Sequence, residues 1–250
     1  MNAIRTAAAI GVAASLCACG GGSSDDGTSP GNPTGTTTTY SKTAPVANAR
    51  DTFATAVVDD ENNTINGGYE ETVTAVNADG SYTLHQDDPS GNTLTVDGVV
   101  YHFDDQVLQF DAQGNETSYT GTRADGGAFS CTIAQTGGHP LPWYVGQAWS
   151  QTSTISCAGG GTDTITETGT VVAVESVTVP AGTFQALKQQ LVITQDTPGG
   201  THIVETRTGW RDPAHSLFLL KSSSTFQYSG SNVPAHHAVG KTIELTARSN

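Results

Sequence analysis

Short segments of alternating apolar and polar residues, separated by turn residues, recur along this chain from about residue 45. Residues 71–76 and 81–84 flank an Asp79-Gly80 turn, and similar hairpins are readable at 95–103 and 107–120. Alternation with a period of two is the pattern of β-strands, and Asp-Gly is a strong hairpin signal. We therefore predict an all-β fold: an antiparallel meander that forms a curved sheet, a sandwich or a half-barrel.

The charge of the chain restricts its partners. The 250 residues include 24 acidic and 10 basic side chains, which gives a formal charge of −14. Nucleic-acid binders are normally basic, so this composition argues against nucleic acid as a partner. No apolar stretch approaches the roughly 20 residues that a membrane-spanning helix needs.

The first 18 residues have the pattern of a secretory signal peptide, with Arg5 before an Ala-rich apolar segment. The segment ends in Leu16-Cys17-Ala18-Cys19, followed by Gly20. This resembles the lipobox of bacterial lipoproteins. The resemblance implies that signal peptidase cuts before Cys19, that the Cys19 thiol carries a diacylglycerol, and that palmitate can be added to the new amine. A residue other than Asp after the cysteine resembles the default for the outer membrane of Gram-negative bacteria.

Two alternatives to Cys19 lipidation remain open. Cys17 is a second candidate, although Leu16 before it is bulky where the lipobox has a small residue. A plain secretory signal cut near Ala18 would leave Cys19 as a free thiol at the new terminus. With Cys19 lipidated, the membrane becomes a partner through the N-terminal lipid.

The chain divides into three parts by composition. After the signal peptide of residues 1–18, residues 19–44 hold the lipidated Cys19 and a flexible linker of Gly, Ser, Thr and Pro. A linker of this kind spans about 25–30 Å between its ends. Residues 45–250 form a β-rich domain with two possible halves, 45–138 and 143–250. Residues 170–174 echo 72–76, and 147–149 match 51–53, which indicates either an internal duplication or hairpins that are alike without common descent.

A second resemblance lies at residues 179–184, with the sequence Val-Pro-Ala-Gly-Thr-Phe. It resembles a hairpin of uncharacterised bacterial envelope lipoproteins, over roughly residues 145–225, and implies no catalytic residue. Gly182 can take the positive φ of a tight turn. We expect Phe184 and Ala186 to share the core face of the following strand, and Gln185 to point outward.

Cys131 and Cys157 are the two remaining cysteines, and both lie in strand-like segments. A single pair of cysteines in an exported domain predicts a disulfide. Neither cysteine has flanking ligands with the spacing of a zinc site.

No catalytic, nucleotide-binding or metal-binding motif is found in the chain, so we predict neither a cofactor nor a metal site. The acidic runs near residues 59–61 read as solvated turns or Ca²⁺ ligands, and His236-His237 as loop residues. Five aromatic residues could pack in the core or form a ligand platform: Trp143, Tyr144, Trp149, Trp210 and Tyr228.

Three functions are compatible with these features. The first is a non-enzymatic, lipid-anchored envelope protein whose β domain has a binding or structural role, with an envelope protein or a small ligand as partner. The second is a carrier that holds an apolar molecule on a curved sheet lined with Val, Leu and Phe. The third is an enzyme without a recognisable motif, which would need a cleft with perturbed carboxylates or histidines.

Overall fold

The computed structural model describes residues 37–88, 95–96, 99–100, 105–122, 127–138, 141–216 and 218–249. Cys19 and the linker up to residue 36 lie outside the described residues. Every helix or strand in the described part is a β-strand: β1 (Arg50–Asp59), β2 (Thr64–Val76), β3 (Tyr82–Asp87), β4 (Thr95–Val96), β5 (Val99–Val100), β6 (Gln106–Phe110), β7 (Glu116–Thr122), β8 (Ala128–Gly138), β9 (Ala148–Cys157), β10 (Thr162–Val179), β11 (Gly182–Asp196), β12 (Thr201–Asp212), β13 (Phe218–Gly230) and β14 (Ala238–Ser249).

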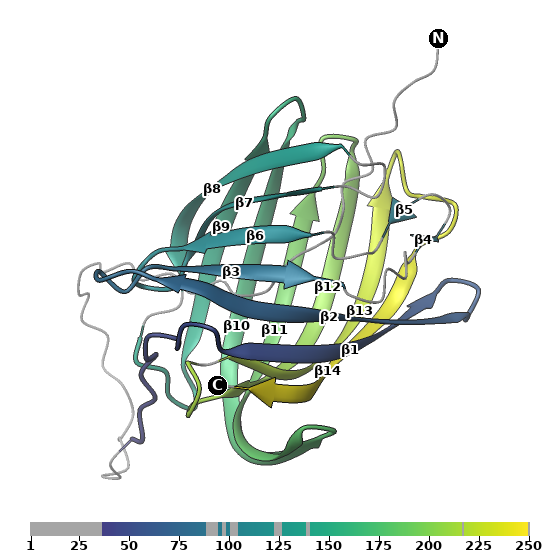
Figure 1. Cartoon of the computed structure of the whole chain (residues 1–250). Helices are drawn as coiled ribbons and strands as arrows, with labels where there is room; N and C mark the ends of the chain where they lie inside the picture. Colours follow the sequence, from purple (N-terminus) through teal and green to yellow (C-terminus); the bar gives the residue numbers. More distant parts are fainter. Residues whose placement is uncertain are drawn as a thin grey trace, which may run out of the picture.

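Twelve of these strands form one closed antiparallel barrel (Figure 1). Strands adjacent in the barrel follow one another along the chain, apart from the separate β4–β5 pair between β3 and β6. The predicted all-β antiparallel meander is confirmed. The sheet curves until β1 pairs with β14, from Arg50 opposite Ser249 to Asp59 opposite Ala238, and this pairing leaves no open edge.

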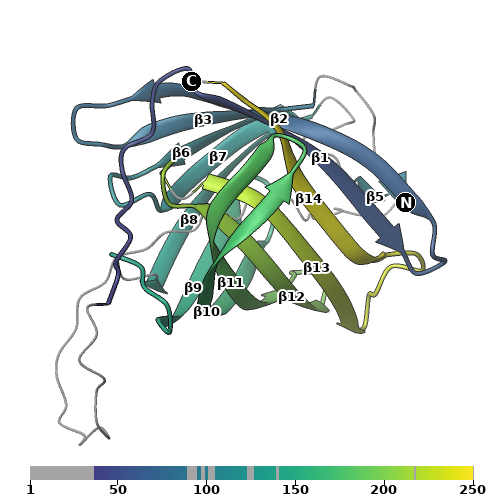
Figure 2. The same ribbon diagram turned by 90° about the horizontal axis from the view of Figure 1, so that it is seen from below.

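One end of the barrel is covered by the hairpin between β10 and β11. Figure 2 shows this hairpin crossing the barrel end toward β1 and β14. The Ala181 N–H donates a hydrogen bond of 3.2 Å to the carbonyl of Leu245 on β14. Val177 and Val179 belong there to the same buried core cluster as Phe53 of β1. We call this end of the molecule the hairpin end.

The strand after this hairpin follows the predicted alternation only in part. Gly182 has φ +140°, a conformation that favours glycine, and Gln185 is exposed, both as expected. Phe184 is only half-buried, whereas both Ala186 and Leu187 are 0% exposed. The expectation of a fully buried Phe184 is therefore wrong, because the residue lies at the start of the hairpin that crosses the barrel end, where it packs against the core but stays partly exposed.

The predicted disulfide joins Cys131 on β8 to Cys157 on β9, which lie directly opposite each other in register. Their Cα atoms are 4.0 Å apart and Cys131 is buried. A cross-link between residues separated by 26 positions stabilises a fold by about 3 kcal/mol in the chain-entropy model.

The two predicted halves have the same local structure where each begins. The turns at residues 46–49 and 144–147 are 98 positions apart, and each is closed by a hydrogen bond of 3.1 Å between its last N–H and its first carbonyl. The third residue of each turn has positive φ: +67° at Asn48 and +94° at Gly146. Six barrel strands follow each turn.

The equivalence continues into the next strand of each half. The backbone of Val73 in β2 hydrogen-bonds to the first turn, and the backbone of Val171 in β10 bonds to the second. A β-bulge follows both residues, between Val73 and Ala75 and between Val171 and Ala173. The halves thus share a turn, a bulge and a buried valine at one spacing. Common descent of the halves stays a prediction.

Candidate functional site

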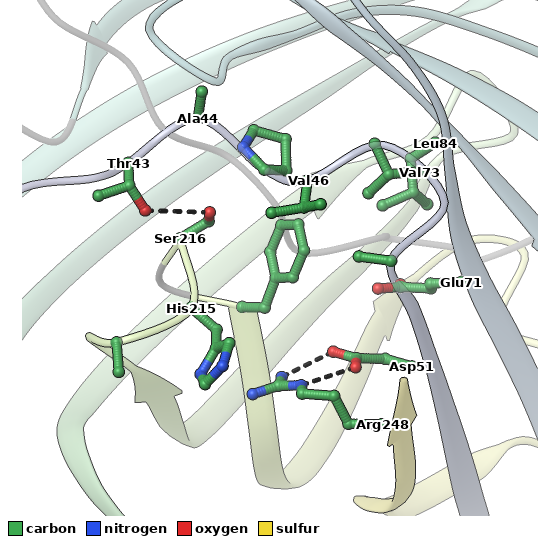
Figure 3. A pocket seen from close by; sticks show the side chains of 14 residues that line it. Thr43, Ala44, Val46, Asp51, Glu71, Val73, Leu84, His215, Ser216 and Arg248 are labelled. Atoms are coloured by element: carbon green, nitrogen blue, oxygen red, sulfur yellow. Dashed lines mark hydrogen bonds and ion pairs between the residues drawn. The ribbon is translucent and has the colours of Figure 1, made fainter. Parts of the chain in front are cut away.

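A cavity of about 90 Å³ lies at the hairpin end of the barrel, between the chain that enters β1 and the loop that joins β12 to β13 (Figure 3). Part of its lining, here called the apolar wall, includes Val46, Val73, Leu84 and Phe218. The remainder, here called the polar wall, carries ionisable and polar groups: Asp51, Glu71, His215, Ser216 and Arg248. A cavity with one apolar wall and a few convergent polar groups is the common form of a small-ligand site.

An ion network holds the polar wall together. Arg248 donates two hydrogen bonds of 2.7 Å to the carboxylate of Asp51, and a third of 2.6 Å to Asp212. Asp212 also lies 2.7 Å from Nδ1 of His215. The side chains of Arg248, Asp51 and Asp212 are 11%, 7% and 3% exposed, so the network lies largely away from solvent. Charged hydrogen bonds in such surroundings fix their partners in place.

Glu71 is the titratable group at the centre of the polar wall. In the barrel register it lies directly between Asp51 on β1 and Gln86 on β3, and Gln86 Nε2 donates a hydrogen bond of 2.6 Å to its carboxylate. Burial raises the pKa of Glu71 to about 7, and the charge of Asp51 contributes to the increase, against the opposing effects of Gln86, Arg211 and Arg248. Glu71 is therefore close to half-ionised at neutral pH.

The end of the N-terminal linker forms part of the cavity wall. Tyr40 forms a two-way backbone bridge with Trp143, with N···O distances of 2.7 and 2.8 Å. Lys42 Nζ donates to the hydroxyl of Tyr82 at 3.1 Å, and the hydroxyls of Thr43 and Ser216 are 3.3 Å apart. The chain that leads from the predicted lipid anchor is thus attached to the barrel beside the cavity.

The second half of the barrel fills the equivalent position with an indole ring. The pair Asp51 and Glu71 is directly opposed in β1 and β2, and 98 positions further on Trp149 and Gly169 are directly opposed in β9 and β10. A Cβ atom on Gly169 would lie 2.2 Å from the Trp149 ring, so the indole lies flat against this glycine. The structure therefore aligns Asp51 with Trp149, whereas the sequence comparison aligned Asp51 with Gln147, two residues earlier.

The comparison of the two halves shows that the cavity differs from ordinary core packing. In the second half, Trp149 is 7% exposed, stacks on Trp143 with ring centres 6.1 Å apart, and donates to Glu167 at 3.0 Å. In the first half, the same two positions carry carboxylates beside an open volume. The second half places an aromatic ring where the first half places ionisable groups. Local exceptions of this kind are typical of functional sites.

The barrel interior is not the apolar surface that a carrier with a Val, Leu and Phe lining requires. Arg207 Nε and Nη2 donate to Glu205 at 2.7 and 2.8 Å, and Arg211 Nε donates to Gln189 at 3.0 Å. Further buried polar side chains lie on the interior face: Gln86, Gln106, Gln151, Glu167, Ser222 and Ser224. A 12-stranded barrel is too wide for its side chains to fill as tightly as those of an eight-stranded one, and here charged and amide groups occupy much of the interior.

The other residues singled out from the sequence do not converge on one site. Trp143 and Trp149 are buried in one core cluster, whereas Trp210 is partly buried and packs against another, with Lys188 Nζ 5.4 Å from its ring centre. The ring of His237 packs against the ring of Tyr228, whereas Nδ1 of His236 lies 3.6 Å from a carboxylate oxygen of Asp60. The five aromatic residues thus form no shared platform.

Among the described residues, neither a metal-binding cluster nor a membrane-spanning helix is found. No three His, Cys, Asp or Glu side chains among them are placed so that they could hold a metal ion. The same residues contain no helix that is long and apolar enough to cross a membrane.

Sequence reasoning missed the residues of this cavity. Asp51 and Arg248 are 197 positions apart and meet only because β1 closes the barrel against β14. One local signal was present for Glu71: strand alternation puts it on the same face as Tyr69 and Val73, which are 4% and 1% exposed. An acid at an inward position between two core residues is the pattern that indicates this site.

Comparison with known proteins finds only distant similarity to solved structures, each with a TM-score below 0.5. No protein-family model matches the chain, and no curated protein matches it. A predicted exported protein with a YmcC-like fold from Bacteroides fragilis is similar with a TM-score of 0.47 and 11% identity, over 84% of this chain and 100% of that one. A predicted lipoprotein from Parabacteroides distasonis has a TM-score of 0.45 and 12% identity, over 84% of this chain and 99% of that one. The hypothetical lipoprotein YmcC from Escherichia coli has a TM-score of 0.38 and 13% identity, over 78% of this chain and 87% of that one.

Proposed function

We propose that this protein is a lipid-anchored protein of the bacterial outer membrane whose barrel binds a small ligand at the hairpin end. The observation that carries the binding role is the cavity itself, which has an apolar wall and an ion network where the second half of the barrel has a tryptophan. The anchor rests on Leu16 to Cys19 and on the polar linker that follows. No catalytic residue is proposed, because Arg248 and its two carboxylate partners bind one another.

The anchor is proposed to act by its lipid alone. Removal of residues 1–18 deletes Arg5 and no acid, so the mature chain carries a formal charge of −15. Anionic lipid headgroups repel such a chain, whereas each buried CH₂ of an acyl chain contributes about 0.8 kcal/mol to membrane binding. The linker then allows the barrel to stand off the membrane.

Cys19→Ser tests the anchor. In a Gram-negative host, the wild-type protein should incorporate labelled palmitate and fractionate with the outer membrane, because the thiol of Cys19 is the acceptor. The variant should lose all label and move to the soluble periplasmic fraction. Cys17→Ser is the matched control and should retain both label and location. Label that survives in Cys19→Ser would contradict the assignment.

Blocking the cavity tests the binding role. Ala214 is exposed and lines the cavity rim, so Ala214→Trp should obstruct the opening without disturbing the barrel. Ligand-observed NMR with a library of small fragments should find compounds that bind the wild-type protein and that lose at least about tenfold in affinity for the variant. Val145→Trp, at an exposed position in the turn at residues 144–147 and away from the cavity lining, is the control. Fragments that bind both variants as they bind the wild type would contradict a site at this cavity.

A further inference from the structure

We propose that the cavity at the hairpin end binds a small organic cation: a primary or secondary ammonium group that carries a short apolar substituent. The inference rests on the proposed binding role and names the class of ligand. The ammonium group would lie between Asp51 and Glu71, and the substituent would lie against Val73, Leu84 and Phe218. Figure 3 shows Glu71 between Val73 and Leu84 above it and Asp51 and Arg248 below it.

The arginine of the site is poorly placed to bind an anion. Arg248 already donates Nε and Nη2 to Asp51 and Nη1 to Asp212. An anionic ligand would have to compete with two buried carboxylates for these donors. It would also enter a site where three acids, with Glu71 as the third, face two arginines, Arg248 and Arg211, so one negative charge is in excess when Glu71 is ionised. A cation meets the opposite balance of charge.

Glu71 supplies the acceptor that a cation needs. One carboxylate oxygen accepts from Gln86 Nε2 at 2.6 Å, and in the part of the chain that the structure describes no other donor is hydrogen-bonded to the group. The charged and titratable groups around it come from several elements: Asp51 on β1, Tyr69 on β2, Arg211 and Asp212 on β12, His215 in the loop after β12, and Arg248 on β14.

Ionisation of Glu71 and binding of a cation should promote each other. Burial and the neighbouring Asp51 raise the pKa of Glu71 to about 7, which means that the ionised carboxylate is under-compensated in the free protein. A bound ammonium group supplies the missing positive charge and lowers this pKa. Binding at about pH 7 should therefore release about half a proton, and affinity should rise as the pH rises through 7.

The cavity limits the size of the ligand. A water molecule needs roughly 10–15 Å³ of cavity volume, so about 90 Å³ accommodates a molecule of about six to nine non-hydrogen atoms. The rim is open to solvent, because Val46 is 61% exposed and Ala44 and Ala214 are exposed as well. Free amines and the ethanolamine headgroups of membrane lipids share the ammonium group that Asp51 and Glu71 would bind.

Three probes with the same four-carbon chain separate charge from size: n-butylammonium, n-butanol and n-butyrate. We expect isothermal titration calorimetry of the full chain at about pH 8 to show that butylammonium binds at least about tenfold more tightly than butanol, with butyrate weakest. Titrations in buffers of different ionisation enthalpy should give the proton release. Displacement of butylammonium by vesicles that contain phosphatidylethanolamine would assign the ligand to a lipid headgroup, and lack of displacement would assign it to a free amine.

Glu71→Gln is the decisive variant, because glutamine has the shape of the protonated acid and should fold. It should abolish both the preference for butylammonium over butanol and the pH dependence of binding. Glu70→Gln is the matched control: Glu70 neighbours it on the outer face, where it pairs with Arg50, so both properties should persist.

Two results would overturn the proposal that the ligand is a cation. One is equal or tighter binding of butanol or butyrate, and the other is a preference that survives in Glu71→Gln. Fragments blocked by Ala214→Trp that are neutral or acidic would refute the ligand class and leave the binding role intact. An absence of any blocked fragment would refute the binding role itself.

Discussion

Replacement of Arg248 by methionine should lower the free energy of unfolding by about 3–5 kcal/mol at neutral pH, because it leaves two buried carboxylates without their counterion. The side chains of Asp51 and Asp212 are 7% and 3% exposed, and Arg248 donates three hydrogen bonds of 2.6–2.7 Å to them. Methionine retains most of the apolar stem. The loss should therefore come from the uncompensated charge and not from a cavity.

Urea unfolding of the two proteins measures this difference. Arg50→Met is the control: Arg50 neighbours Asp51, but its side chain is 50% exposed and its ion pair with Glu70 lies on the outer face. An exposed pair of this kind contributes within about 1 kcal/mol. Equal small losses in both variants would show that solvent reaches the network and screens it.

The strands of this protein could be predicted because their signal is local. A period of two, Asp-Gly turns and frequent threonine each act over a few residues, so the all-β meander is readable before any long-range contact is known. The disulfide is readable for a similar reason, since an exported domain with two cysteines in strand-like segments has one simple way to pair them. Both predictions are confirmed by the structure.

Closure of the barrel and the cavity depend on pairings that no local pattern specifies. Whether a meander stays open or closes is decided by the contact of β1 with β14, from opposite ends of the domain. That contact brings Asp51 to Arg248. The hairpin after β10 shows the same limit, because its alternation predicts a buried Phe184, and only its path across the barrel end explains why Ala186 and Leu187 are both fully buried.

The barrel is held by packing and by its continuous hydrogen-bonded wall, so it tolerates buried acids that cost stability. Burial raises the pKa of the partly buried Glu71 to about 7 and that of the buried Glu116 to about 8. Glu71 lines the cavity, where a cation could recover the cost. Glu116 does not line it, and its effect on folding can therefore be measured without the ligand.

Glu116→Gln should stabilise the protein at alkaline pH. Glu116 is 5% exposed at the start of β7, and burial raises its pKa from 4.5 to about 8. The folded state therefore holds this proton more tightly than the unfolded state does. The free energy of unfolding should fall as the pH rises from about 4.5 to about 8, by up to about 5 kcal/mol from this group. Glutamine carries no charge and removes that dependence.

The measurement is urea unfolding of both proteins at about pH 5 and about pH 9. The two should be nearly equal in stability at the lower pH, because Glu116 is protonated there and resembles glutamine. At the higher pH the variant should be more stable by several kcal/mol. Other titrating groups, Glu71 included, affect both proteins alike and cancel in the difference. Glu61→Gln, whose side chain is 60% exposed, should show no such gain. A difference between wild type and Glu116→Gln that stays constant with pH would mean that the carboxylate of Glu116 is hydrated in the folded barrel.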